Sequence, residues 1–206
     1  MKKLIAVLLA AVVAAPSFAA AYFNEAQIKS LQEKLSAVKE PSRKANLEAR
    51  IAVLSMDNPT FETVLKTTET IYAKYNRPKR EGHVRVCGFA IWPYAKFAPD
   101  AYKLAVSDKL HHVAWKLVVR FQSQLGFSDQ TAFDILANDI LEHRVAQPGA
   151  VKQIVARMLV IAPNCDPAKV KTALNKLNRL LSPRLLEDKA KWEPAVAMIR
   201  TALETY

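Results

Sequence analysis

The stretch LHHVAWKLVVRFQSQLGFSDQTAFDILANDIL, residues 110–141, contains the clearest evidence for the fold. Its apolar residues recur at three- and four-residue steps, the spacing of one face of an α-helix. They are Leu110, Val113, Ala114, Leu117, Val118, Phe121 and Leu125, then Phe133, Leu136, Ala137, Ile140 and Leu141. Between the two sets, Gly126 is typical of a helix C-cap and Ser128 of an N-cap. The stretch therefore predicts two consecutive amphipathic helices.

The rest of the chain has the same character. Only four of the 206 residues are glycine, against a usual share of about 7%. Few glycines allow few tight hairpin turns, so little sheet is expected. Asp166-Pro167 and Ser182-Pro183 are further helix starts, and Pro194 is expected to bend or restart the last helix. The sequence predicts an all-α protein with a helical bundle over residues 100–206, because the short connections favour antiparallel neighbours.

Residues 20–76 are predicted to form an N-terminal helical hairpin followed by a third helix. The apolar stripe that begins at Ile28 stops at Pro41, and a second stripe follows it. Proline disfavours helix at the residue before it, so Pro41 marks the turn of the hairpin. Asn58-Pro59 is typical of the start of the third helix, with Asn as the cap and Pro at the first helical position.

Residues 77–99 are predicted to be a basic and aromatic connection between these two parts. Both Pro78 and Gly82 lie at its start, and from Val84 to Ala98 no helical period is evident. A short strand or an irregular packed segment is expected there. Arginine and aromatic residues are enriched where proteins bind each other. The residues predicted to bind a partner are Arg77, Lys79, Arg80, His83, Arg85, Trp92 and Tyr94; the alternative is that the aromatics are core and the basic run is a solvated loop.

Residues 1–19, MKKLIAVLLAAVVAAPSFA, combine a charged start, an apolar run and a small-residue end. This is the three-part pattern of a cleaved bacterial secretory signal peptide. The apolar run is shorter than the roughly 20 residues of a membrane-spanning helix. We therefore expect a periplasmic protein that is not an integral membrane protein.

Cys87 and Cys165 are the only cysteines. An even number of cysteines in an oxidising compartment usually pairs, so the sequence predicts a Cys87–Cys165 disulfide. Two separate buried thiols are the alternative. Their spacing matches neither a C-x-x-C redox motif nor a haem-attachment motif, and no cofactor is expected.

The formal net charge is +11, which favours anionic partners. Nucleic acid is not expected outside the cytoplasm. The expected partner is another protein or an anionic component of the envelope. A generally basic surface with no specific partner is the alternative.

Neither a metal site nor a catalytic site is predicted. The adjacent His111 and His112 point about 100° apart on a helix and do not share an ion easily. The pairs Asp108/His112 and Asp139/His143 are four residues apart, a spacing that usually stabilises a helix surface. No nucleophile elbow, H-E-x-x-H motif or glycine-rich phosphate loop occurs.

The sequence therefore favours a non-catalytic periplasmic protein that binds another macromolecule, such as an accessory component of a secretion or conjugation assembly. An inhibitor or immunity protein of an envelope hydrolase is one alternative. An unrecognised periplasmic hydrolase that uses His112 is the other.

Overall fold

The computed structural model describes residues 25–91 and 94–206, and in this part of the chain every regular element is a helix. The all-α prediction is confirmed. The signal peptide predicted over residues 1–19 lies outside the described residues. The chain forms two compact units, of which unit 1 ends at Phe89 and unit 2 begins at Ala90.

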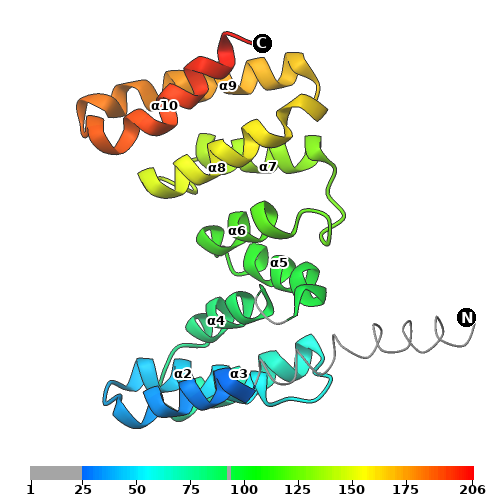
Figure 1. The fold of residues 1–206 in the computed structure, drawn as a ribbon, viewed down its shortest axis with the longest axis vertical. Helices are drawn as coiled ribbons and strands as arrows, with labels where there is room; N and C mark the ends of the chain where they lie inside the picture. Colours follow the sequence, from blue (N-terminus) through cyan, green and yellow to red (C-terminus); the bar gives the residue numbers. More distant parts are fainter. Residues whose placement is uncertain (1–24, 92–93) are drawn as a thin grey trace, which may run out of the picture. The chain divides into compact units, whose positions relative to one another are not determined.

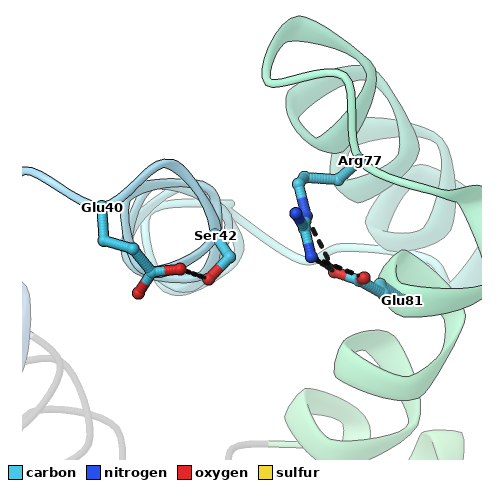
Figure 2. Close-up of polar contacts among 4 residues, drawn as sticks. All are labelled: Glu40, Ser42, Arg77 and Glu81. Atoms are coloured by element: carbon cyan, nitrogen blue, oxygen red, sulfur yellow. Dashed lines mark hydrogen bonds and ion pairs between the residues drawn. The ribbon is translucent and has the colours of Figure 1, made fainter.

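Unit 1 contains a helix over residues 25–37, then α2 (Pro41–Leu54), α3 (Phe61–Lys74) and most of α4 (Lys79–Ile91). Pro41, where the sequence predicts the turn of the hairpin, is the first residue of α2. The Ser42 hydroxyl donates to the Glu40 carboxylate there (Figure 2). α2 packs against α3. Ala45 and Ala49 of α2 and Tyr72 of α3 form a small buried core.

The cap of α3 differs from the prediction. Thr60 rather than Asn58 is the N-cap, and Asn58 has a positive φ of 44°. The Thr63 amide donates to the Thr60 hydroxyl at 3.1 Å, and the Thr60 amide donates to the Thr63 hydroxyl at 3.0 Å. This reciprocal capping box satisfies two N–H groups, which explains why the helix begins after Pro59.

The predicted connection over residues 77–99 is largely helical, so the expectation of a strand or irregular segment from Val84 is wrong. α4 follows Pro78 directly and continues through Gly82. Val86 and Cys87 are fully buried and Val84 is half-buried. Because apolar residues lie on several sides of α4, no single stripe marks it as a helix in the sequence.

Unit 2 begins with the last residues of α4 and continues with short 3-10 turns and six longer helices. They are η1 (Ala95–Phe97), α5 (Ala98–Ser107), α6 (His111–Phe121), α7 (Asp129–Leu141), α8 (Pro148–Ile161), η2 (Ala162–Asn164), α9 (Pro167–Leu181), η3 (Ser182–Leu186) and α10 (Lys189–Leu203). α5 packs on α6, α6 on α7, α7 on α8 and α9 on α10. In addition, α6 packs on α8, α7 on α9 and α8 on α10. The unit is thus a stack of helix pairs, and Figure 1 shows these helices in successive layers. This layered packing is more specific than the predicted bundle.

The core of unit 2 lies along the stripes that the sequence predicts. Its fully buried larger side chains include Phe133, Leu136 and Ile140 of α7, Ile154 and Met158 of α8, Leu174 and Leu177 of α9, and Ile199 of α10. Ser128 caps α7 by accepting from the Thr131 amide, as predicted, and Asp166 caps α9. Ser182-Pro183 begins only the 3-10 turn η3; α10 is capped by Asp188 and contains Pro194. No helix among the described residues is long and apolar enough to cross a membrane.

The predicted Cys87–Cys165 disulfide is wrong: the two buried cysteines form no disulfide. Cys87 lies in unit 1 and Cys165 in unit 2. The thiol of Cys165 donates to the Ile161 carbonyl at 3.4 Å, and burial raises its pKa. The argument from an even cysteine count is wrong here because each sulfur packs into the core of its own unit.

We expect two thiols per chain to react with Ellman's reagent when the purified protein is unfolded without reductant. In the native protein the same thiols should react slowly, because burial suppresses the thiolate. Reductant should leave the melting temperature unchanged. Thiols that appear only after reduction would contradict the structure.

Gly126 has a φ of +70°, a conformation that costs an L-residue roughly 1 kcal/mol. Gly126→Ala should therefore lower the free energy of unfolding by about that amount. Gly149→Ala is the matched control, because Gly149 lies in α8 and an added Cβ there meets no atom within 4 Å. Urea unfolding followed by circular dichroism measures both; equal effects would refute the role of the positive φ.

Candidate binding site

Most of the basic residues predicted to bind a partner lie along α4. This group, the α4 basic segment, comprises Arg77, Lys79, Arg80, His83 and Arg85. Arg77 donates from Nε to Oε2 of Glu81 at 3.0 Å and from Nη2 to Oε1 at 2.7 Å (Figure 2). The planar fork of the guanidinium matches both carboxylate oxygens. Arg77 precedes α4 and is already paired with Glu81, in the first turn of that helix.

Two further members of the segment bind one carboxylate of α3. His83 is 6% exposed, and its Nε2 lies 2.8 Å from Oε1 of Glu69. Nζ of Lys79 lies 3.3 Å from the same oxygen. Partial burial acts to raise the pKa of Glu69, but the hydrogen bonds with His83 and Lys79 outweigh it, and the pKa of Glu69 is lowered. These contacts hold α4 against α3.

Arg85 hydrogen-bonds the side chain of Tyr72, which is buried in the core of unit 1. Burial raises the pKa of Tyr72, and the charge of Arg85 acts in the opposite direction. Arg80 is exposed. Four of the five basic residues thus make contacts within unit 1, and the prediction that the segment binds a partner stays a prediction.

The structure describes only one of the two aromatic residues that were predicted to bind a partner, Trp92 and Tyr94. Trp92 lies outside the described residues. Tyr94 is half-buried, and its ring centroid lies 5.4 Å from that of Phe97, which is buried. Tyr94 therefore packs locally within unit 2.

A site that the sequence did not predict lies in unit 2, between α6 and the turn from α7 to α8. It is a cavity of about 550 Å³, called here the basic pocket. α6 contributes His112, Trp115 and Lys116, the turn contributes residues 143–147, and α8 contributes Gln153 among others. The volume is within the range of small-ligand sites, about 300–1,000 Å³.

The α6 wall follows from helix geometry. His112 and Lys116 are four residues apart, so they lie on the same face. Both are exposed, whereas Trp115 between them is 3% exposed and belongs to the core. Nζ of Lys116 lies 5.6 Å from the Trp115 ring centroid. The buried indole therefore fixes the direction in which the two polar side chains leave the helix.

The opposite wall is set by how α7 ends. His143 has a positive φ of 56°, which reverses the chain, and its amide donates to the Ile140 carbonyl at 3.0 Å. The amide of Val145 donates to the Asp139 carbonyl at 3.0 Å, and the Val145 side chain is buried. This is the usual way in which a left-handed residue closes a helix C-terminus. It brings His143 and Arg144 to the cavity.

Arg144 is held at the pocket by two carboxylates. Its Nη1 lies 3.4 Å from Oδ1 of Asp139, and its Nη2 donates to Glu142. Asp139 is 4% exposed, and burial raises its pKa, although Arg144 acts against this shift. An uninterrupted helix would place His143 beside Asp139. Because α7 ends at Leu141, the ion partner of Asp139 is Arg144 instead.

The pocket can hold an anion. Its lining contains Lys116, Arg144 and two histidines, and none of the described residues that line it is acidic. Gln147 caps α8 without a side-chain hydrogen bond, so the positive end of the helix dipole adds to the same field. Among the described residues no group of three or more metal-ligating side chains could hold a metal ion. Comparisons with family models, curated proteins and solved structures yield no match.

We expect Glu69→Gln to lower the free energy of unfolding at pH 7 by about 1 kcal/mol, because it removes a charged partner of His83 and Lys79. The pKa of Glu69 is depressed in the folded state. Its contribution is therefore complete above the ordinary value near 4.3 and is lost as the pH falls through the folded value. Chemical unfolding at several pH values measures this.

Glu33→Gln is the control, since Glu33 is exposed on the helix over residues 25–37. It should change stability by less than about 0.5 kcal/mol at every pH. A Glu69→Gln effect that is absent at pH 7, or that persists undiminished well below the ordinary pKa of glutamate, would contradict the stabilising role of the Glu69 charge.

Proposed function

We propose that the protein is a non-catalytic binding protein that recognises an anionic partner macromolecule through the basic pocket of unit 2. The observation that carries this proposal is a cavity lined by Lys116, Arg144 and two histidines, with no carboxylate among the described residues that line it. Such an arrangement raises the local concentration of anions and favours their binding.

Binding is favoured over catalysis by the chemistry of the lining. Acid–base hydrolysis needs a carboxylate or a nucleophile held near a base. The described lining residues include no serine, threonine, cysteine or acid. The pocket has histidines that could move protons, but its described lining residues include no hydroxyl, thiol or carboxylate nucleophile. The hydrolase alternative, which uses His112, therefore has less support than a binding role.

The proposal includes export to the periplasm. This part of the proposal depends only on the sequence of residues 1–19. Buried thiols are compatible with an oxidising compartment, because a thiol without access to solvent and with a raised pKa reacts slowly. In that compartment an accessory component of an envelope assembly is the preferred role. An inhibitor of an envelope hydrolase would use the same pocket to bind an acidic surface of its target.

The pocket and the α4 basic segment are competing contact surfaces, and the structure favours the pocket. In the segment, the carboxylates of Glu69 and Glu81 already neutralise neighbouring cations. In the pocket, Arg144 is paired with Asp139 and Glu142, but Lys116 lies on an exposed helix face and makes no ion pair with a described carboxylate. Charges that lack a nearby carboxylate attract a partner more strongly.

Purified protein should bind poly-glutamate with an affinity that falls as salt rises. Lys116→Glu should weaken this binding about tenfold, roughly 1.4 kcal/mol, without changing the melting temperature. Two charge-matched controls separate the surfaces. Lys169→Glu alters another cavity, between α7 and α9, and Arg80→Glu alters the exposed cation of α4.

Titration calorimetry measures the affinity of the wild type and of the three variants for poly-glutamate. Neither control should lose more than about twofold in affinity. Equal losses in all three variants would mean that only net charge matters, and a loss confined to Arg80→Glu would place the contact on α4. Either result would overturn the assignment to the pocket.

A further inference from the structure

We infer that the basic pocket receives a carboxylate side chain from an acidic segment of another protein, and that Asp139 is the positioning residue that holds Arg144 ready to bind it. This inference rests on the proposed function and names the chemistry of its ligand. It follows from three features of the pocket: how Arg144 is restrained, how much positive charge remains, and the recessed form of the site.

Restraint of Arg144 comes from the buried side of the turn. An arginine on an exposed turn ordinarily samples many rotamers, and ordering one costs up to about 2 kcal/mol of conformational entropy. Here Nη1 is tied to Asp139, and Asp139 lies on α7 beside the buried Ile140. The guanidinium is thus ordered before any ligand arrives, and its five N–H groups allow it to contact more than one acceptor.

Asp139 is poorly explained by stability alone. It is 4% exposed, and the charged form is disfavoured because burial outweighs the attraction of Arg144. A neutral residue of the same shape would avoid this penalty. Buried charges whose environment opposes ionisation occur often at functional sites. Holding Arg144 at the mouth of the pocket gives the carboxylate such a role.

The remaining charge suits a monoanion. Asp139 and Glu142 both contact Arg144 and offset much of its charge, which leaves Lys116 as the main uncompensated cation beside the histidines. A carboxylate needs one such partner and can accept from the guanidinium in the same plane. A phosphate carries more charge than this set balances.

The recess favours a side chain over a lipid surface. The cavity is lined by the buried Trp115 and Val145 as well as by the exposed Lys116 and Arg144, so it reaches inward from the surface. Lipid headgroups in a flat bilayer attract cations that project outward. A glutamate or aspartate on a protein segment can enter a cavity of about 550 Å³ and contact the amide of Gln153 as well.

The test uses the full mature chain and a defined probe, a peptide of eight glutamates, with inorganic phosphate and phosphatidylglycerol vesicles as comparison ligands. Calorimetry measures binding to the wild type, Asp139→Asn, Arg144→Gln and the double variant. Each single variant should lose about tenfold in peptide affinity, and the double variant should lose no more than either one, because both act through the same contact.

A second readout separates positioning from general structural damage. The Nε–Hε signal of Arg144 in NMR spectra of the free protein should show restricted motion in the wild type and greater motion in Asp139→Asn. The melting temperature of Asp139→Asn should be unchanged or higher. Glu142→Gln is the matched control and should lose less affinity, since Glu142 is exposed.

Each outcome decides a different point. A wild type that does not bind the peptide overturns the proposed function and this inference with it. Three results overturn the positioning role of Asp139 alone: unchanged peptide binding by Asp139→Asn, affinity losses that add in the double variant, or an Asp139→Asn protein that does not fold. In each case Arg144→Gln still tests whether the pocket binds the peptide. Tighter binding to vesicles or phosphate than to the peptide overturns the carboxylate assignment.

Discussion

The packing of α7 against α6, α8 and α9 is the constraint on which the rest of unit 2 depends. Phe133, Leu136 and Ile140 are almost completely excluded from solvent, so one face of α7 is fixed by the core. Burial of such side chains contributes about 1.5–3 kcal/mol each and determines the rotation of the helix about its axis. Asp139 precedes Ile140, so the same rotation determines where its carboxylate lies. The pocket is therefore a consequence of how the core is packed.

Local signals in the sequence were sufficient where a helix has one apolar face and a side-chain cap. The α7 stripe and the Ser128 and Asp166 caps are all present in the structure. α4 was not predictable in this way, because Val86 and Cys87 are buried while apolar residues also lie on its other sides. The disulfide failed for a different reason. A cysteine count carries no information on which unit each sulfur packs into.

The candidate site shows the same limit. A run of basic residues is visible in the sequence, but Glu69 belongs to another helix, and its contacts with Lys79 and His83 are tertiary. The pocket could not be predicted from the sequence, because His112 and His143 are 31 positions apart in the numbering. They line one cavity only because α6 packs beside the turn after α7. The spacing of His112 and Lys116 was the one local hint, and by itself it indicates an ordinary exposed helix face.

The contrast between α4 and the pocket shows how a strongly basic chain can remain selective. Long-range attraction depends on the total charge, which is +11, and it acts on any anion. Specific binding needs cations that are ordered and are not already satisfied. In unit 1 the carboxylates of α3 and α4 take up the charge and use it to join the helices. In unit 2 the carboxylate of Asp139 is buried, whereas its partner Arg144 is exposed and lines the cavity, so this ion pair leaves the cation accessible to a ligand. The exposure of the paired cation at a cavity thus separates a candidate binding site from a structural ion pair.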